Sequence, residues 1–475
     1  MKESFFFYDL ETSGINPREA RIMQFAGQRT DMDLQPMGEP VDMLITLTDD
    51  VLPDPGAIMI TGITPQQTKA DGVTEREFLQ YFHENIAVEN TVFVGFNSLR
   101  FDDEFMRYLH YRNFYDPYEW HWRGERSRWD LLDVVRMTRA LRPEGIAWPV
   151  REDGVSNNRL EELAKINQLP HESAHNALSD VQATIALAGL VRAKQPKLFD
   201  YLFSIRKKNE VMKIVDSGRP FVYSSGKYEN EFEKTTVVAK VVNHPDKQGA
   251  IVFDLRYDPA DYIAMSPKQL AEIWKYNKDK TADRLPAKTL QYNRCPAIAP
   301  LTVINEDCQA RLHIDLQKIQ KHYDALVSAQ DFGSKLVEAI SLMNKGRKTE
   351  SKQVLVDERL YDGFLPDQDK PKLASVRQAT ADSINELAGR FKDDRFNELL
   401  PLYKARNFPT KLNDEEYADW QKYKIAKFNK GSPSRIERFY ETLQELGSNP
   451  KLNKQQLYIL EELQLYAESI VPEKD

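Results

Sequence analysis

An alternation of short apolar runs and helical patterns along residues 1–195 restricts the possible folds more than any other feature of the sequence. Residues 4–10 and 91–96 are runs of aromatic and aliphatic residues, which suit β-strands buried on both faces. Within residues 65–88, apolar residues are spaced to form one stripe of a helix. Strands interleaved with helices imply an α/β layer fold. The other predicted elements are strands at residues 22–30 and 41–48 and helices at residues 159–166 and 178–193.

The pattern changes beyond residue 195. Residues 235–242 and 250–255 are β-rich, and Ser266 with Gln269 can form a capping box that starts a helix. The chain after a polar segment at residues 344–352 is mostly helical, with predicted helices at residues 393–405, 414–428, 434–446 and 454–470. One hydrophobic core rarely organises 475 residues. We therefore expect three domains, at residues 1–195, 196–352 and 353–475, of which the second is α+β or barrel-like.

Composition excludes some classes of protein. The apolar runs fall short of the ~18 residues that a membrane helix needs, so no membrane association is expected. The N-terminal segment turns acidic too early for a secretory signal. Cys295 and Cys308 could pair, but two thiols in so long a chain favour a reduced, cytoplasmic protein. A net charge of −8 argues against a protein that coats nucleic acid, but permits a confined basic groove.

Two carboxylates stand at the end of the first predicted strand. Asp9 and Glu11 are two positions apart, so in a strand their side chains project from the same face. Like charges this close raise the pKa of one another unless a cation neutralises them, and hard oxygen ligands suit Mg²⁺ or Mn²⁺. An Asp-x-Glu pair alone is more often a solvated strand end, so the motif needs support from elsewhere in the chain.

Two more polar clusters lie in the same domain. Asn97 follows the strand predicted at residues 91–96, and Phe101 can pack so that Asp102 points at the end of the sheet. A helix N-terminus decorated by acids is the alternative reading of this cluster. Asp180 falls on the first turns of a predicted helix, and His175 cannot share its face within that helix. We therefore expect His175 in the preceding loop, where a capping or surface role is the alternative.

Together these clusters resemble the three motifs of the DEDDh exonucleases, a branch of the ribonuclease H-like nucleases. The motifs are Asp-x-Glu, Asn followed by Phe-Asp, and His-x4-Asp, carried here by Asp9, Glu11, Asn97, Phe101, Asp102, His175 and Asp180. Thr61-Gly62-Ile63-Thr64 also resembles a turn common in that group.

The resemblance implies a phosphodiester hydrolase that uses two Mg²⁺ ions, with Mn²⁺ as a possible substitute, and releases 5′-mononucleotides. Asp9, Glu11 and Asp180 would hold one ion, and Asp9 would bridge to a second ion that Asp102 supports. His175 would accept the proton of the attacking water. The expected substrate contacts are Glu11 and Thr12 with the terminal nucleotide and Arg159 with a phosphate.

Longer segments resemble the bacterial exonuclease I family and are rich in Trp, Tyr and Phe. They span residues 112–118, 127–133, 141–146, 195–203 and 405–409. This resemblance implies an α/β ribonuclease H-like exonuclease domain, an SH3-like α+β domain with inserted helices and a C-terminal helical domain, which together form a C-shaped clamp. It implies a monomer that degrades single-stranded DNA processively from the 3′ end in DNA repair and recombination. It also implies a partner, the acidic C-terminal tail of single-stranded DNA-binding protein, with Arg142 and Tyr201 at the matching positions.

Residues 403–438 combine nine Lys and Arg side chains with six aromatic ones and five acids, which leaves a charge of about +4. Basic and aromatic groups are what a channel for single-stranded nucleic acid needs, so the segment favours DNA contact over a solvated basic face. Residues 206–208 form a smaller basic spot. Asp130 and Asp133 are expected to make structural hydrogen bonds at the start of a helix rather than to bind metal.

Two alternative functions stay open at this point. A 3′→5′ exoribonuclease of the DEDDh family would carry the same motifs, which do not distinguish DNA from RNA. A catalytically silent clamp that binds single-stranded DNA is the other alternative, although such a protein would be free to lose some of the four carboxylates and the histidine that this sequence retains.

Overall fold

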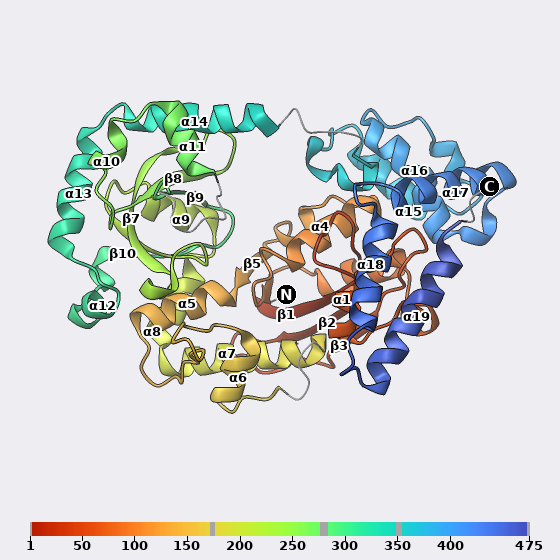
Figure 1. Ribbon diagram of the computed structural model, residues 1–475, viewed down its shortest axis with the longest axis horizontal. Coiled ribbons are helices and arrows are strands. Elements are labelled where there is room, and N and C mark those ends of the chain that lie inside the picture. Colours follow the sequence, from red (N-terminus) through yellow and green to blue (C-terminus); the bar gives the residue numbers. More distant parts are fainter. Residues whose placement is uncertain (1, 172–175, 276–283, 348–353, 473–475) are drawn as a thin grey trace. The chain divides into compact units, whose positions relative to one another are not determined.

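The computed structural model describes residues 2–171, 176–275, 284–347 and 354–472. The chain forms two compact units whose elements are labelled in Figure 1. The first unit contains residues 1–126, 172–182 and 353–475, and the second contains residues 127–171 and 183–352. Each unit therefore combines stretches that are distant in the sequence.

Four strands organise the first unit. They are β1 (Ser4–Thr12), β2 (Ile22–Thr30), β3 (Val41–Leu44) and β4 (Thr91–Gly95), in the spatial order β3-β2-β1-β4. β1 is antiparallel to β2 and parallel to β4. Both β1 and β4 are almost completely buried, which confirms the interpretation of their apolar runs. Because β1 and β4 are parallel, the segments that follow them leave the sheet at the same edge.

One face of this sheet is covered by helices. Phe6, Tyr8 and Leu10 of β1 share a core with residues of α3 (Glu75–Tyr81) and α4 (Asp102–Arg112). Side chains alternate along a strand, so Asp9 and Glu11 belong to the opposite face. The remaining helices before residue 126 are α1 (Pro55–Thr61), α2 (Pro65–Asp71), a π-helical turn η1 (Phe82–Ile86) and a 3-10 turn η2 (Glu119–His121).

The single helix predicted at residues 65–88 is wrong, because α2, α3 and the π-helical turn replace it. Gly72 separates α2 from α3, and its backbone lies directly against β3. A Cβ atom at Gly72 would stand 2.3 Å from the carbonyl oxygen of Thr68 and 3.1 Å from that of Leu44. The chain then starts a new helix at Thr74, which forms a capping box. The close approach of Gly72 to β3 and the capping box at Thr74 together interrupt the helix here.

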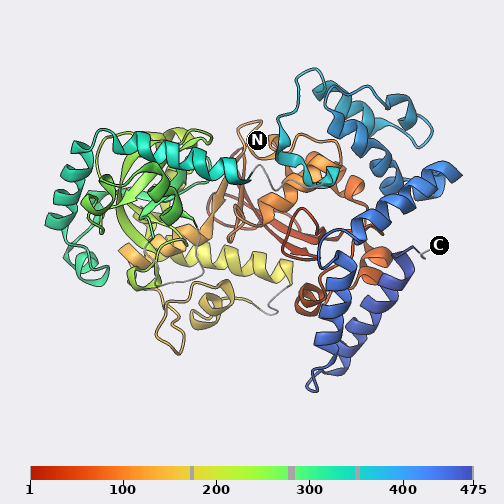
Figure 2. The same ribbon diagram turned by 45° about the horizontal axis from the view of Figure 1, so that its top comes forward.

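The C-terminal part of the first unit is helical, as predicted. Its helices are α15 (Lys370–Gln378), α16 (Asp394–Asn407), α17 (Asp414–Phe428), α18 (Arg435–Gly447) and α19 (Lys454–Ile470). Helices α18 and α19 lie side by side in both views (Figures 1 and 2). Buried residues of α4 share one core with α15 to α17, and buried residues of α1 share another with α18 and α19. The C-terminal helices are thus packed directly on the N-terminal sheet domain.

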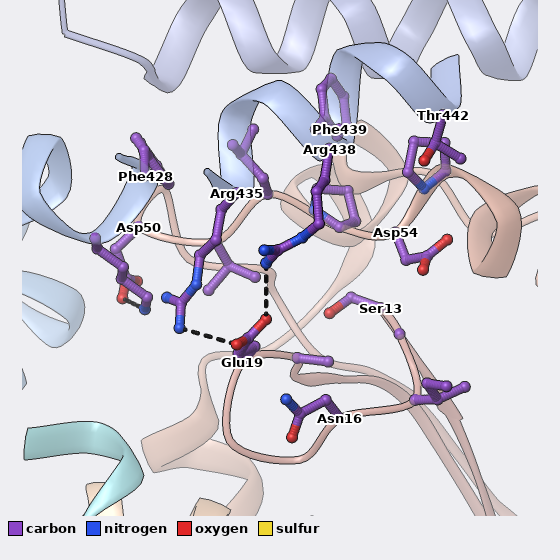
Figure 3. A pocket seen from close by; sticks show the side chains of 18 residues that line it. Ser13, Asn16, Glu19, Asp50, Asp54, Phe428, Arg435, Arg438, Phe439 and Thr442 are labelled. Carbon is purple, nitrogen blue, oxygen red and sulfur yellow. Dashed lines mark hydrogen bonds and ion pairs between the residues drawn. The ribbon is translucent and has the colours of Figure 1, made fainter. Parts of the chain in front are cut away.

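Ion pairs reinforce this packing at the surface. Figure 3 shows a pocket where Glu19, in the loop after β1, points toward Arg435 and Arg438 of α18. Its carboxylate lies 3.3 Å from Arg435 and 3.5 Å from Arg438.

A second sheet organises the second unit. Strands β6 (Phe221–Ser224), β7 (Thr235–Asn243), β8 (Gly249–Asp254), β9 (Ala287–Gln291) and β10 (Ala297–Pro300) run in the order β10-β6-β7-β8-β9, all antiparallel. The capping box predicted at Ser266 is present and starts α11. The other elements of this unit are β5 (Ser127–Asp130), α5 (Leu131–Leu141), α6 (Leu160–Ile166), α8 (Pro196–Ser204), α9 (Lys208–Val215), α10 (Ala260–Ile263), α11 (Pro267–Trp274), α12 (Glu306–Arg311), α13 (Leu316–Ser328) and α14 (Phe332–Arg347).

The cysteines and the helices of the structure bear on two expectations from composition, a possible disulfide and membrane association. Cys295 and Cys308 are both free thiols, so the alternative of a disulfide between them is excluded. Among the described residues, none of the helices has the length and apolar content that crossing a bilayer requires.

Candidate active site

The candidate site begins at the end of β1. Asp9 lies opposite Ala26 of β2, and Glu11 lies opposite Gln24, so both carboxylates project from the same face of the sheet. Asp9 is partly exposed, whereas Glu11 retains an exposed fraction of 8%. The register shifts between Glu11 and Thr12, where a bulge ends the regular pairing.

Helix α7 (Ala177–Lys194) supplies the third carboxylate. The side-chain oxygen of Asn176 accepts a hydrogen bond from the amide of Ser179 at 3.2 Å, which caps the start of the helix. Asp180 follows within the first turn, a favourable position for an acid. One carboxylate oxygen from each of Asp9, Glu11 and Asp180 lies within 4.8 Å of the others. The structure therefore brings Asp180 to the Asp9–Glu11 pair, from which it is about 170 positions away in the sequence.

Asp102 is not one of these three residues, but it lies near Asp9, after the turn that follows β4. The turn after this strand includes Asn97 in the left-handed region, with φ of 68°. The Phe101 ring packs on Phe105 at a centroid distance of 4.9 Å and joins the core, as the sequence predicts. Asp102 is then the first residue of α4, with an exposed fraction of 3%, and its charge acts on Asp9.

The four carboxylates oppose one another's ionisation. Burial raises the pKa of Asp9 well above its usual value, and the charges of Asp102, Asp180 and Glu11 raise it further. Burial, followed by the charge of Asp180, raises the pKa of Glu11 to about 7. A divalent cation would remove this repulsion, and a set made only of carboxylate oxygens suits a hard ion such as Mg²⁺ or Mn²⁺. The residues of the cluster therefore fit a divalent metal.

The other predicted residues of the active domain lie in different surroundings or outside the described residues. His175 lies outside the described residues. Thr12 is buried, and its hydroxyl donates to the carbonyl oxygen of Gly14 at 2.8 Å. Gly62 ends α1 in the left-handed conformation with φ of 72°, which explains the need for glycine in the Thr61-Gly62-Ile63-Thr64 turn. Residues of this turn line a pocket together with Gln24, the partner of Glu11, and Asn176.

Three predicted contact residues belong to the second unit. Arg159 precedes α6, and its guanidinium is exposed and lies 3.5 Å from the Glu161 carboxylate. Arg142 follows α5, and its Nη2 donates to the carbonyl oxygen of Val303 at 3.1 Å. Tyr201 lies on α8, and within the described part of the chain its buried hydroxyl oxygen has no hydrogen-bond partner.

Asp130 and Asp133 have the structural role that the sequence predicts. Asp130 caps α5 by accepting a hydrogen bond from the amide of Leu132 at 3.0 Å. Asp133 pairs with Arg136 at 2.7 Å.

The basic segment at residues 403–438 is used differently from the prediction. Arg406 donates to Asp50 at 2.8 Å and to Asp357 at 2.6 Å, and Lys427 pairs with the same two carboxylates. Lys404 pairs with a glutamate of α17 at 2.5 Å. The side chains of these three cations are at most 6% exposed, so the interpretation of the segment as a DNA-contacting track is wrong for them. The sequence shows their charge but not the carboxylates that fold onto them.

The first unit also has three exposed aromatic side chains that are not among the predicted contact residues. The exposed fractions are 90% for Phe364, 56% for Trp122 and 47% for Tyr361. Phe364 lines one pocket with Tyr118. An aromatic residue beside a glycine in a polar loop, as in Gly363-Phe364, is the one signal in the sequence that points to this group.

Comparisons with known proteins cover every part of this architecture. Three family profiles match the chain: exonuclease at residues 6–188, exonuclease I SH3-like domain at residues 206–341 and exonuclease I C-terminal domain at residues 355–470. The exodeoxyribonuclease I of Haemophilus influenzae is 40% identical over 470 residues, which is 98% of this chain and 98% of that protein.

Solved structures point to the same family as the profiles do. That of a moderately thermophilic exonuclease I from Methylocaldum szegediense shares 40% identity, with a TM-score of 0.93 over 99% of this chain and 100% of the other. Escherichia coli exonuclease I in complex with a dA16 oligonucleotide shares 36% identity, with a TM-score of 0.92 and the same coverage. A structure of SSB/exonuclease I with the inhibitor CFAM is also 36% identical, with a TM-score of 0.90 over 99% of this chain and 100% of the other.

These matches confirm the exonuclease, SH3-like and C-terminal domains that the sequence resemblance implies. They extend over nearly the full length of the relatives, at identities well above those that arise between unrelated chains. The chain therefore belongs to the exodeoxyribonuclease I family.

Proposed function

We propose that this chain is a 3′→5′ exodeoxyribonuclease that needs divalent metal and releases 5′-mononucleotides from single-stranded DNA. The observation that carries the proposal is the set of carboxylate oxygens from Asp9, Glu11 and Asp180 within 4.8 Å of one another. Family membership supports the DNA substrate, since a relative that is 36% identical forms a complex with a dA16 oligonucleotide.

The metal ligands are proposed as follows. Asp9, Glu11 and Asp180 would hold one Mg²⁺ ion, and Asp9 and Asp102 would hold a second, with Mn²⁺ as a possible substitute. The raised pKa values of Asp9 and Glu11 support this assignment, because they show negative charge that the protein itself does not neutralise. When bound, two such ions stabilise the charge on the attacking and leaving oxygens of a phosphodiester.

The remaining roles belong to side chains around the carboxylates. His175, outside the described residues, accepts the proton of the attacking water, a task that neutral imidazole performs well near neutral pH. Glu11 and Thr12 contact the terminal nucleotide, and Arg159 binds a phosphate. The pocket lined by Gln24, Asn176 and the Thr61–Ile63 turn supports a place for the terminal nucleotide beside Glu11.

The exposed aromatic group supports a single strand as substrate. Stacking of bases on aromatic rings tolerates any sequence and contributes about 1–3 kcal/mol per base. Phe364 and Tyr118 line one pocket. Aromatic faces in one region suit unstacked bases better than a duplex, whose bases are already stacked.

Further proposals concern the domain boundaries, the protein partner and the cellular role of the enzyme. We assign the exonuclease, SH3-like and C-terminal domains to residues 1–195, 196–352 and 353–475. Arg142 and the Tyr201 ring are proposed to receive the acidic tail of single-stranded DNA-binding protein, and the SSB/exonuclease I structure of a relative supports such a partner. A processive monomer in the cytoplasm, acting in DNA repair and recombination, completes the proposal.

The decisive experiment uses a 5′-labelled single-stranded oligonucleotide with Mg²⁺. We expect a ladder that shortens from the 3′ end and that a chelator abolishes.

Asp180→Asn should release nucleotides at least about 100-fold more slowly, because it removes a metal ligand, while DNA binding is retained. Asp324→Asn, which changes an exposed carboxylate on α13, is the control and should behave as the wild type. Equal degradation of a matched RNA strand would favour the exoribonuclease alternative, and no degradation of either strand would favour the silent clamp.

A further inference from the structure

A hydrogen bond behind β1 links the strand that carries Asp9 to the helix that carries Asp102. The Tyr8 hydroxyl donates to Oδ1 of Asp103 at 2.6 Å, across 95 positions of the chain. Both partners are almost completely buried, with exposed fractions of 3% for Tyr8 and 1% for Asp103. Each partner is the immediate chain neighbour of a candidate metal ligand, so the bond joins two of the carboxylate motifs.

The Tyr8 ring is held by aromatic side chains. Phe25 of β2 is stacked on it at a centroid distance of 6.1 Å, while Phe93 of β4 and Trp120 meet it edge to face at 6.2 and 6.5 Å. Such arrangements restrict the orientation of the ring. The hydroxyl is therefore a fixed point, set by the core of the sheet domain, to which the start of α4 is attached.

The turn between β4 and α4 is packed on the same strand. Gly95 approaches β1 so closely that a Cβ atom would lie 3.1 Å from the carbonyl oxygen of Tyr8. The turn continues through Asn97, and the amide of Asp103 donates to the carbonyl oxygen of Ser98 at 2.9 Å. Backbone contacts thus hold the beginning of the turn, and the Tyr8 hydroxyl holds its end.

Asp103 also interacts with the next turn of α4. Burial opposes the charge of Arg107, but Asp103 and Glu104 raise the pKa of its guanidinium above the usual value. Asp103 therefore interacts both with Arg107 on the next turn of α4 and with the Tyr8 hydroxyl on β1.

We propose that Tyr8 is a positioning residue of the metal centre, which acts through Asp103 to fix the first turn of α4 and thereby the place of Asp102 beside Asp9. This inference rests on the function proposed for the carboxylate cluster. A phenylalanine at this position would make the same ring contacts with Phe25. The packing of the core therefore does not require the hydroxyl of Tyr8.

Tyr8→Phe tests the proposal, because it keeps the ring and removes only the hydroxyl. We expect the affinity for Mn²⁺, measured by calorimetry without DNA, to fall about tenfold or more, as it does when other groups that orient metal ligands are removed. The metal concentration for half-maximal nucleotide release should rise by the same factor. Saturating metal should restore kcat, and KM for a single-stranded oligonucleotide should not change. An unaltered affinity for Mn²⁺ in the folded variant would overturn the proposal.

Tyr111→Phe is the matched control. Tyr111 is also a buried tyrosine, on α4, and its hydroxyl donates to the carbonyl oxygen of Val356 at 3.0 Å. Its loss should lower Tm and leave Mn²⁺ binding intact, whereas equal losses of affinity in the two variants would show a general effect of stability and refute a positioning role.

A second variant keeps the test decisive if Tyr8→Phe does not fold. Asp103→Asn retains the size of the acceptor and weakens the bond, so it should also reduce Mn²⁺ affinity, and the double variant should add little to either single change. Independent, additive effects would contradict a shared role. Because Mn²⁺ binding is read without DNA, a wild-type protein that binds metal but does not degrade DNA would reject the proposed function and not this inference.

Discussion

Glu11 combines two influences that disfavour its charged form. Its exposed fraction is only 8%, and Asp180 places a second carboxylate oxygen within 4.8 Å. Burial, followed by the charge of Asp180, raises its pKa to about 7. Strongly perturbed carboxylates in one cluster are typical of functional sites, because the arrangement that weakens the acid is the one that concentrates negative charge for a cation. Proton and metal therefore compete for the same oxygens.

This competition predicts that metal affinity depends on pH. The pKa of Glu11 is raised to about 7 in the folded protein, so a proton occupies the site below pH 7 and must leave when metal binds. Below that pH we expect the apparent affinity for Mn²⁺ to fall by up to about tenfold per pH unit for each proton displaced. Calorimetry at pH 6 and pH 8, in buffers that differ in ionisation enthalpy, measures both the affinity and the protons released. Equal affinities at the two pH values, without proton release, would contradict the assignment.

At the scale of secondary structure, the sequence predicts elements whose cause is local and fails where the cause is a distant contact. The strand at Ile22–Thr30 and the helix at Lys454–Ile470 have the predicted bounds. Their signals, continuous burial for the strand and a capping box for the helix, come from adjacent residues. The interruption at Gly72 has causes of both kinds: the capping box of Thr74 and Glu77 is a local signal, whereas the nearness of β3 is not visible in the sequence. The candidate site has features of both kinds. The spacing of the motifs predicts Asp102, whereas the hydrogen bond between Tyr8 and Asp103 joins distant residues and is not visible in the sequence.

The turn between β4 and α4 gives a prediction at this scale. A methyl group at Gly95 would stand 2.5 Å from the Ser98 Cβ atom and 3.1 Å from the Tyr8 carbonyl oxygen. Gly95→Ala should therefore push the turn away from β1 and lower the free energy of unfolding by about 1–3 kcal/mol, the usual effect of overpacking. Urea denaturation measures the change. Activity should fall at the same time, because the turn leads to Asp102.

Gly189→Ala is the control for this prediction. Gly189 lies inside α7, and an added Cβ atom there would meet nothing within 4 Å. Alanine favours a helix interior over glycine by up to about 1 kcal/mol, so this variant should be as stable as the wild type or more stable. A loss of stability equal to that of Gly95→Ala would show that the contact with β1 does not explain the effect.

At the scale of the whole first unit, a buried ionic cluster connects the N-terminal sheet domain to the C-terminal helices. Arg21 and Asp50 come from the N-terminal part, and Asp357, Arg406 and Lys427 come from the C-terminal part. All five side chains are at most 5% exposed. The sequence could not reveal this cluster, because its members are up to 406 positions apart and each looks like an ordinary surface charge. Buried charges of both signs neutralise one another only in the folded chain.

The cluster predicts that one carboxylate supports the attachment of the C-terminal helices. Asp357 accepts from Arg21 at 3.1 Å and from Arg406 at 2.6 Å, and these cations hold its pKa far below the usual value against the effect of burial. Asp357→Asn would leave Asp50 to balance the charges of Arg21, Arg406 and Lys427, so we expect the free energy of unfolding to fall by about 3–5 kcal/mol. Asp419→Asn, which removes an exposed partner of Lys422 on α17, should cost at most about 1 kcal/mol. Urea denaturation of both variants decides the matter: equal midpoints would mean that the buried charges contribute no more than a surface pair, and that apolar packing alone holds the C-terminal helices in place.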